Sequence, residues 1–466
     1  MPGSRPACYR LAALLLLYVS FISLTACQAV VVSPTLVPTV EPSPTSGPTA
    51  TPLPPAGVFW VDLTRDQGEL SKFVLGVNHG PWSDFSLDSF KKTIALGVTF
   101  MRWPGGNWGD RNDIRSLMID NYIAQARTIG AEPSISVRVP GSTPARAAEI
   151  VRYANLTKGY AVKYWNIGNE PNLYENDPGL NIDEKWTPQR YARVWREFAL
   201  AMRAVDPGIL FYGPDISQFV DDPQNPGADA VARAYLTEFL KVNGDLVNIV
   251  TVHRYPFPAC LTCGNPDWED MRANTAEWDQ ILVKLRRVIR ETTGKELPVG
   301  VTEYNSNYSS AAGAETSPDS FYSALWLADV YGRLLRQQPE LLAYWQIKNN
   351  AAGYGLLTSF DVRPSYYSFV MWKKFGNHLL FASTDAQYVS VYAARAEDGR
   401  LTVMLINLNA TPLNQPLQLK GGDQLQLVEA FLFDATHPAE ALPIPNFTNG
   451  AGVTLPPESV TLLIFR

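Results

Sequence analysis

Two glutamates stand in positions where they could act on a substrate. Glu170 lies in the turn Asn169-Glu170-Pro171, directly after an apolar and aromatic run, and Glu303 ends a second such run that begins at Val299. A pair of carboxyl groups can divide the work of cleaving a glycosidic bond, because one protonates the leaving oxygen while the other attacks carbon or activates water. The two side chains are therefore candidate catalytic groups, provided that the fold brings them together.

The surrounding sequence predicts a fold that does so. Short β-branched or aromatic runs alternate with segments of helical periodicity, a pattern typical of parallel strands joined by helices. The expected strands are 73–78, 99–103, 133–137, 162–168, 210–214, 249–253, 299–303 and 342–346. The expected helices are 89–96, 114–129, 144–154, 189–205, 228–241, 278–290, 321–335 and 366–375. Eight such units predict a (β/α)8 TIM barrel, whose active site lies at the carboxyl ends of its strands.

A second domain is expected after the barrel. Helical periodicity ends near residue 375, and alternating segments follow at 388–393, 401–408, 417–419, 425–433 and 460–465, which predicts a β-sandwich. The stretch 58–62 is expected to pair with this sheet. The predicted organisation is a signal peptide at 1–27, a linker at 28–56, the barrel at 57–377 and the β-sandwich at 378–466.

These motifs resemble clan A of the glycoside hydrolases, which are retaining (β/α)8 enzymes. The resemblance covers nearly the whole mature chain and rests on Gly168-Asn169-Glu170-Pro171 in strand four with Glu303 in strand seven. The run Arg102-Trp103-Pro104-Gly105-Gly106-Asn107 is similar to the α-L-arabinofuranosidase family, whereas residues 165–172 look more like the heparanase and β-glucuronidase family. The trailing sandwich is shared with the β-xylosidase and α-iduronidase family. The resemblance therefore indicates a clan but does not choose a family.

The resemblance implies roles for individual residues. Glu170 would be the general acid/base, Glu303 the nucleophile, and Asn169 would bind the hydroxyl next to the anomeric carbon. The two glutamates would need opposite protonation states at the start of turnover. Trp345, near the end of strand eight, would form a stacking floor for the sugar.

Other residues at the strand ends are expected to support the two glutamates or to contact substrate. Arg102 would favour the ionised form of Glu303, or serve only as a structural ion-pair partner. Tyr255 would hydrogen-bond to Glu303 and orient it. His253 would either bind substrate or support a neighbouring group. Asn78, at the end of the first strand, is an expected substrate contact.

Several further residues have two interpretations. Asp215 follows strand five and is either structural or in contact with substrate. The aromatic residues in or beside the strand-to-helix loops either line a sugar cleft or fill loop cores: Trp82, Trp103, Trp108, Trp186 and Tyr304. A substrate with a carboxylate would need a cation, which Arg254 or Lys348 could supply.

The N-terminus predicts export. Arg5 and Arg10 precede an apolar run at 11–24, which is the layout of a secretory signal and is short for a membrane-spanning helix. The residues Leu24-Thr25-Ala26-Cys27 resemble a bacterial lipobox, so Cys27 would carry a lipid anchor; the alternative is an ordinary signal with an incidental cysteine. The Pro/Thr/Ser-rich stretch 33–55 would form an extended tether.

Cysteine usage agrees with an oxidising compartment. Beyond the signal, only Cys260 and Cys263 remain, as Cys-Leu-Thr-Cys. This spacing predicts a small disulfide loop. Free thiols or a redox pair are the alternatives, but the pair does not open a helix, and no second Cys or His pair completes a zinc site.

Composition limits the partners. The chain has 45 acidic and 39 basic residues, a formal net charge of −6, and no Lys/Arg-rich run, which argues against nucleic acid. No cofactor or metal is expected, because the chemistry needs none and no ligand cluster stands out.

The preferred hypothesis is therefore a cell-surface retaining glycosidase that acts on extracellular poly- or oligosaccharides. The alternative is a carbohydrate-binding surface lipoprotein that has lost turnover. The presence of both glutamates favours the enzyme.

Overall fold

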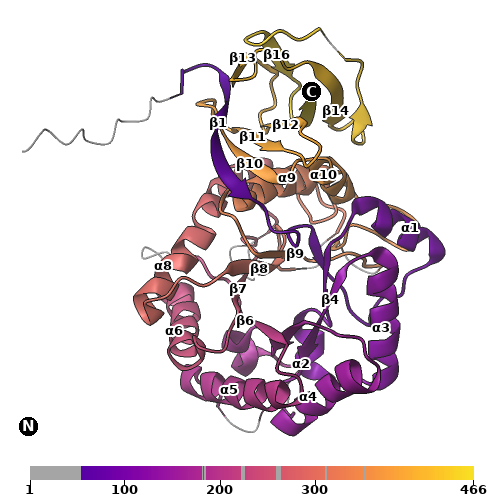
Figure 1. The fold of residues 1–466 in the computed structure, drawn as a ribbon, viewed down its shortest axis with the longest axis vertical. Coiled ribbons are helices and arrows are strands. Elements are labelled where there is room, and N and C mark those ends of the chain that lie inside the picture. Colours follow the sequence, from indigo (N-terminus) through magenta and orange to yellow (C-terminus); the bar gives the residue numbers. More distant parts are fainter. Residues whose placement is uncertain are drawn as a thin grey trace, which may run out of the picture. The chain divides into compact units, whose positions relative to one another are not determined.

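The computed structural model describes residues 54–466 apart from 181, 183–184, 222–225, 259–263, 310–311, 351–352 and 445. This part of the chain contains a closed barrel of eight parallel strands and a nine-stranded sheet (Figure 1). Helices surround the barrel strands, and the sheet lies beside α9 and α10 (Figure 1). The predicted TIM barrel with a C-terminal β-sandwich is thus confirmed. The predicted signal, Cys27 and the pair Cys260 and Cys263 lie outside the described residues.

All eight predicted barrel strands are present. In chain order they are β2 (Gly76–Asn78), β3 (Phe100–Trp103), β4 (Glu132–Val137), β5 (Tyr164–Ile167), β6 (Leu210–Ile216), β7 (Ile249–Arg254), β8 (Val299–Tyr304) and β9 (Leu341–Tyr344). Neighbours in sequence pair in parallel, and β9 closes the barrel on β2. Every residue of β3, β5 and β8 is buried, as expected for parallel strands covered by helices on one face and filled by side chains on the other.

The outer helices match the predicted periodic segments, with two additions. They are α1 (Leu87–Leu96), α2 (Gly106–Arg111), α3 (Ser116–Ile129), α4 (Pro144–Val151), α5 (Pro188–Val205), α6 (Pro226–Asn243), α7 (Trp268–Asn274), α8 (Ile281–Thr293), α9 (Phe321–Arg336) and α10 (Pro364–Lys373). The short helices α2 and α7 were not predicted, and α8 begins at Ile281 because a 3₁₀ turn occupies Thr275–Asp279. Where a helix start was predicted well, a cap explains it: the Thr187 side chain accepts a hydrogen bond from the backbone of Arg190, and Pro188 follows.

The C-terminal sheet also contains the start of the described chain. Its strand order is β15-β14-β17-β12-β11-β10-β1-β13-β16. The strands are β1 (Phe59–Glu69), β10 (His378–Ser383), β11 (Val389–Arg395), β12 (Leu401–Asn407), β13 (Leu413–Lys420), β14 (Leu427–Phe433), β15 (Glu440–Ala441), β16 (Gly452–Leu455) and β17 (Ser459–Phe465). As expected for 58–62, β1 joins this sheet, antiparallel to β10 and parallel to β13. The strands β10, β15 and β16 were not predicted.

The barrel and the sheet share an interface at α9. Most residues of this helix are buried, which fits a helix covered by the barrel on one side and by the sheet on the other. Tyr392 of β11 donates a hydrogen bond to Asp329 of α9 over 2.7 Å, and Phe321 packs edge-on against Phe433 of β14. The interface between the barrel and the sheet therefore contains polar as well as apolar contacts. Within α9, Asp329 also accepts a hydrogen bond from Arg333 over 2.8 Å.

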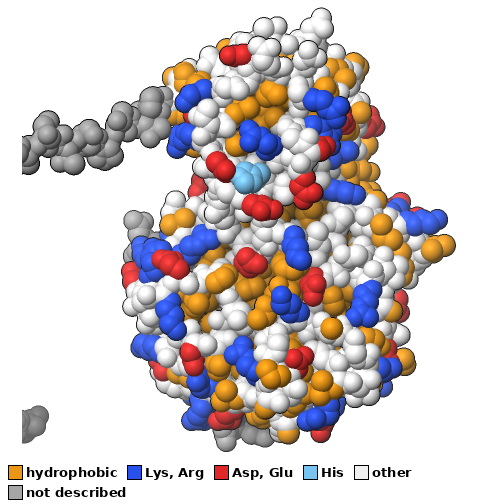
Figure 2. Space-filling model, viewed as in Figure 1, with side chains coloured by type: hydrophobic (Ala, Val, Ile, Leu, Met, Phe, Trp, Pro, Cys, Tyr) orange, Lys and Arg blue, Asp and Glu red, His pale blue; other side chains and the backbone are white. Residues whose placement is uncertain are grey.

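The outer surface carries charges of both signs. In the view of Figure 2, Lys and Arg side chains are interspersed with Asp and Glu over the visible face of the barrel. Ion pairs of the barrel helices include Lys92 with Asp88 and Arg196 with Asp245, each at 2.7 Å. In the described part of the chain, no helix combines the length and the apolar character that crossing a bilayer requires.

Replacing Phe59 by alanine tests whether β1 is integral to the sheet. Phe59 is fully buried in the core of the sheet, so its truncation should lower the free energy of unfolding by about 3–5 kcal/mol. Urea denaturation measures this loss. The control is Leu87→Ala, because Leu87 is 74% exposed and its removal should change stability by less than about 0.5 kcal/mol. Equal effects of the two substitutions would contradict the placement of β1.

Candidate active site

The structure brings Glu170 and Glu303 to the same end of the barrel. Glu170 follows β5, and Glu303 is the fifth residue of β8. One carboxylate oxygen of Glu170 and one of Glu303 lie within 4.8 Å of each other. Both side chains are largely buried, with 9% and 4% of their residue surfaces exposed. The gap between them is therefore short and shielded from bulk water.

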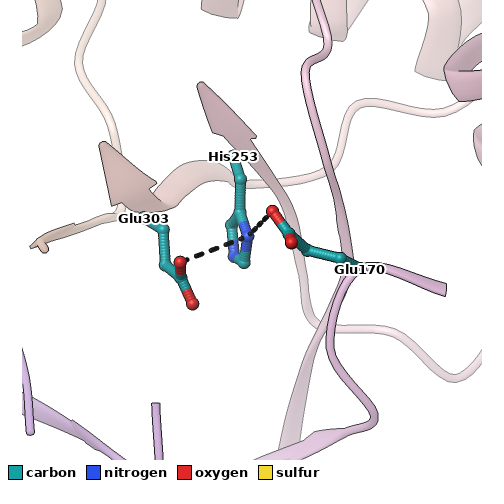
Figure 3. A group of neighbouring side chains, drawn as sticks. All are labelled: Glu170, His253 and Glu303. Carbon is teal, nitrogen blue, oxygen red and sulfur yellow. Dashed lines mark hydrogen bonds and ion pairs between the residues drawn. The ribbon is translucent and has the colours of Figure 1, made fainter. Parts of the chain in front are cut away.

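His253 of β7 points at both glutamates from between them (Figure 3). Its Nδ1 lies 3.0 Å from Oε1 of Glu170 and 3.9 Å from Oε2 of Glu303. The ring is fully buried, so His253 is placed to hold the two carboxylates and not to meet a ligand from solvent. Of the two roles considered for this residue, the geometry favours support.

Glu303 is fixed by three donors. The Arg102 guanidinium donates to its Oε1 over 2.7 Å, and the Gly106 backbone N–H donates to the same oxygen over 3.0 Å. The Tyr255 hydroxyl donates to Oε2 over 2.7 Å. Three donors on its two oxygens hold the carboxylate in one orientation.

Arg102 lies fully buried at the centre of this network. Besides Glu303 it donates to the side chains of Asn78, Asn169 and Asp215, over 2.7–2.8 Å. Burial by itself lowers the pKa of Arg102, but the charges of Asp215 and Glu303 outweigh this effect, and the net result is a pKa above the usual value of arginine. The guanidinium is thus a permanent cation that ties together the ends of β2, β3, β6 and β8 and the turn after β5.

Asp215 is a structural counter-charge. It is fully buried and accepts hydrogen bonds from Arg102, Asn166, Thr251 and Thr302 at 2.5–2.8 Å. Burial by itself raises its pKa, whereas the charges of Arg102 and His253 lower it, and the net result is a pKa well below the usual range. Of the two roles considered for Asp215, the structural one fits this saturated environment.

The turn that carries Glu170 adopts an uncommon backbone conformation. Glu170 has a φ of 47° and ψ of 54°, in the left-handed region that a non-glycine residue occupies at a cost of roughly 1–3 kcal/mol. Its N–H donates to the Asp215 carbonyl over 3.2 Å, and its own carbonyl accepts from Leu173 over 2.8 Å. A strained conformation of this kind persists only where surrounding contacts hold the backbone. In this conformation the Glu170 side chain points towards His253.

The two expected asparagine contacts differ. Asn169 accepts from Arg102 and donates to Asn107 Oδ1 over 2.9 Å, beside the gap between the glutamates. Asn78 is fully buried, and its amide donates to the carbonyls of Thr302 and Ala343 over 2.7 and 3.0 Å. This arrangement favours a positioning role for Asn78 over the substrate contact that we expected.

Aromatic side chains border the site. Trp345 directly follows β9, and its ring lies 5.7 Å from that of Trp82 and 6.4 Å from that of Tyr354. A Cβ on Gly106 would lie 2.4 Å from the Trp345 ring, so only glycine allows this approach. Burial raises the pKa of Tyr354, and so do the negative charges of Glu303 and Glu170.

Several aromatic and cationic residues that were considered as substrate contacts are engaged away from the two glutamates. Trp103 stacks on Tyr122 in the core, and Trp186 and Tyr304 are also buried in the core, so the cleft-lining alternative is wrong for these residues. Arg254 is held by both carboxylate oxygens of Glu277, at 2.6 and 2.8 Å. Lys348 is buried against the Asp84 carbonyl. Both cations are therefore held by groups of the protein, and neither is placed to bind a substrate carboxylate.

One group of side chains among the described residues could hold a metal ion, namely Glu170, His253 and Glu303. No such cluster was expected from the sequence, so the structure corrects that point. The group fits a cation poorly, because Arg102 already places a positive charge 2.7 Å from Glu303. Burial by itself lowers the pKa of His253, but Glu303 and Asp215 raise it to about 9, so at neutral pH the ring has no lone pair for a metal.

Comparison with known proteins places this geometry in context. No family model matches the chain. Over 216 residues the chain is 26% identical to an intracellular exo-α-(1→5)-L-arabinofuranosidase of Streptomyces lividans, which covers 37% of the chain and 30% of that protein. It is 23% identical over 270 residues to a β-xylosidase of Geobacillus stearothermophilus, covering 53% of the chain and 47% of that protein. The chain thus spans less than half the length of these two relatives.

Solved structures are similar over much more of their length. The α-L-arabinofuranosidase from Thermotoga maritima has a TM-score of 0.66 at 17% identity, covering 87% of this chain and 98% of its own. A Paenibacillus polymyxa xyloglucanase of glycoside hydrolase family 44 has a TM-score of 0.67 at 15% identity, with coverage of 87% and 98%. This chain resembles clan A of the glycoside hydrolases. Two of the predicted resemblances, to arabinofuranosidases and β-xylosidases, are represented among the relatives.

Three groups at this site were not predicted from the sequence. The Gly106 backbone N–H has no side-chain signature, although Gly106 lies in the glycine-containing motif after strand two. Asp110 lies four residues further on and accepts the backbone N–H of Asn169 over 2.7 Å. Tyr354 comes from the loop after β9, where no periodicity or motif could have indicated it.

The charge on His253 predicts a pH dependence of stability. Because the pKa of His253 rises from 6.5 to about 9 on folding, its contribution, roughly 3 kcal/mol, is fully present below about pH 6.5 and is lost as pH rises through about 9. Urea denaturation at about pH 6 and about pH 10 measures this loss. The variant His253→Gln cannot be charged and should lack this part of the pH dependence; an identical pH dependence in both proteins would contradict the assigned charge.

Proposed function

We propose that this protein is a retaining glycoside hydrolase in which Glu303 is the nucleophile and Glu170 the general acid/base. The observation that carries the proposal is the separation of the two carboxylates, whose facing oxygens lie within 4.8 Å. Retaining enzymes hold their carboxyl groups roughly 5–5.5 Å apart, whereas inverting enzymes need a wider gap for water. The likeness in fold and the partial sequence matches to glycosidases support the same reaction.

In the first step, Glu303 attacks the anomeric carbon while Glu170 protonates the leaving oxygen. The donors on Glu303, from Arg102, Gly106 and Tyr255, hold it aligned for attack. The products are the free alcohol and a covalent glycosyl ester on Glu303. Asn169 lies beside the gap, where its amide would contact the hydroxyl next to the anomeric carbon.

In the second step, the deprotonated Glu170 takes a proton from water, which attacks the same anomeric carbon and releases Glu303. Two inversions give net retention of configuration. His253 is hydrogen-bonded to Glu170 over 3.0 Å and keeps its carboxyl in reach through both steps. Trp345 would supply the apolar floor for the sugar ring.

The first substrates to test are aryl α-L-arabinofuranosides and β-xylosides, because the two curated relatives carry those names. Aryl β-glucosides and β-glucuronides complete the panel. The engagement of Arg254 by Glu277 and of Lys348 by a carbonyl gives no support to a uronide.

Alanine substitutions test the two roles. Glu170→Ala should lower the turnover of an aryl glycoside by about 10²–10⁴-fold, and Glu303→Ala by more, because it removes the covalent pathway. Added azide distinguishes them: it should yield a glycosyl azide of retained configuration with Glu170→Ala and of inverted configuration with Glu303→Ala. The control is Glu175→Ala, an exposed glutamate of the same turn, which should keep wild-type activity.

The rival hypothesis has a different outcome. A wild-type protein that binds oligosaccharide but hydrolyses no member of the panel would be a carbohydrate-binding lipoprotein. Undiminished hydrolysis by Glu303→Ala would show that another group performs the reaction.

We also propose that the chain is exported and anchored by a lipid on Cys27. Support comes from the basic residues Arg5 and Arg10, the apolar run at 11–24 and the lipobox-like residues before Cys27. Metabolic labelling with a fatty-acid analogue should mark the wild-type protein and the control Cys8→Ser, but not Cys27→Ser. Labelling of Cys27→Ser would contradict the proposal.

A further inference from the structure

Asp110 is a buried carboxylate that the proposed mechanism does not use. It lies in α2, the short helix after β3, and only 2% of its surface is exposed. Its Oδ2 accepts the backbone N–H of Asn169 over 2.7 Å, and its Oδ1 accepts that of Val139 over 3.2 Å. It also hydrogen-bonds to the hydroxyl of Tyr174. One side chain thus joins the segment after β4 to the turn after β5.

The same helix contacts both glutamates or their neighbours. Its first residue, Gly106, donates its N–H to Glu303, and Asn107 accepts from the side chain of Asn169 over 2.9 Å. Asp110 holds the backbone of Asn169, the residue directly before Glu170. The helix α2 therefore sets where the Glu170 turn lies relative to Glu303.

The turn leaves little freedom around this contact. Gly168 has a φ of 81°, and a Cβ there would lie 2.4 Å from the Tyr174 hydroxyl. Tyr174 in turn accepts the Asn169 N–H over 3.3 Å. Asp110 and Tyr174 thus share one backbone donor directly beneath a strained turn, where a lost acceptor would let the Glu170 backbone move.

We propose that Asp110 is a positioning residue that holds the Asn169–Glu170 turn so that Glu170 reaches the leaving oxygen. This inference rests on the proposed function. A displacement of about 1 Å in a reacting group can cost on the order of 10²-fold in rate. Asparagine cannot replace Asp110, because its amide offers one acceptor oxygen to two backbone donors and sets an N–H₂ against one of them.

Opposing effects act on the pKa of Asp110. Burial raises the pKa of Asp110 to about 7, against the hydrogen bonds from Val139, Tyr174 and Asn169 and the charge of Arg102. Burial raises the pKa of Tyr191 on α5, and so do the negative charges of Asp215 and Asp110. Burial thus disfavours the charge of Asp110, whereas the two backbone donors favour it.

The test compares two substrates that differ only in the leaving group. A phenyl glycoside needs a proton from Glu170 to depart, whereas a 2,4-dinitrophenyl glycoside leaves without one. With Asp110→Asn, kcat/KM should fall by about 10- to 10²-fold for the phenyl glycoside and by less than about 3-fold for the dinitrophenyl glycoside. For the dinitrophenyl glycoside, kcat and KM should fall together, because base-assisted hydrolysis of the intermediate becomes slow.

A merely structural role would not produce this difference. The control is Asp329→Asn, which makes the same chemical change at another buried carboxylate, on α9, whose partners are Arg333 and Tyr392. It should lower stability and leave the ratio of the two kcat/KM values at the wild-type level. Equal losses on both substrates in Asp110→Asn, or no loss, would overturn the positioning role.

Two further variants separate the possible failures. If Asp110→Asn does not fold, Tyr174→Phe removes the hydroxyl shared by Asp110 and Asn169 and should show the same preference for the dinitrophenyl substrate; a wild-type ratio would overturn the inference. Glu170→Ala is the reference. If it discriminates between the leaving groups while Asp110→Asn does not, only the positioning role fails. If Glu170→Ala itself does not discriminate, the proposed function fails, and this inference with it.

Discussion

The buried guanidinium of Arg102 is the interaction on which the site depends. It donates at 2.7–2.8 Å to groups on four other segments of the chain, and each of these groups stands at the end of a barrel strand or in the turn beyond one. A lysine could not replace it, because a single ammonium cannot direct several fixed donors to separate acceptors in this way. The planar fork therefore joins the ends of β2, β3, β6 and β8 and the turn after β5 into one rigid platform.

A buried cation of this kind is costly unless it is matched, and the matching explains Asp215. Removing charges from water costs several kcal/mol per ion, which close pairing and further hydrogen bonds must offset. Glu303 alone would leave Arg102 and the protonated His253 with excess positive charge. Asp215 supplies the second fixed anion, 2.8 Å from Arg102 and 3.6 Å from the other nitrogen of His253. Its two threonine donors and Asn166 complete its shell, and so the residue belongs to the charge balance of the site.

The sequence could predict whatever local patterns encode. Apolar strands such as β8 and capped helices such as α5 have periodicity and turn chemistry of their own, so the barrel and its strand ends followed from them. The short elements were missed for the same reason, since six residues of α2 beginning with Gly106 contain too little pattern to indicate a helix. The role of Asn78 could not be read either, because whether an amide at a strand end meets substrate or the carbonyls of Thr302 and Ala343 depends on the curvature of the closed barrel.

The two glutamates have different surroundings. Glu303 receives hydrogen bonds from Arg102, Gly106 and Tyr255, which hold both of its oxygens in place. Among the described residues, Glu170 has one hydrogen-bonded side-chain partner, Nδ1 of His253. A carboxylate held by three donors suits the proposed nucleophile, which must stay in one orientation. A carboxyl held by one donor suits the proposed acid/base, which gains and loses a proton in each cycle. The backbone of this residue must then be fixed in another way, and the contacts of Asn169 with Asp110 and Arg102 do so.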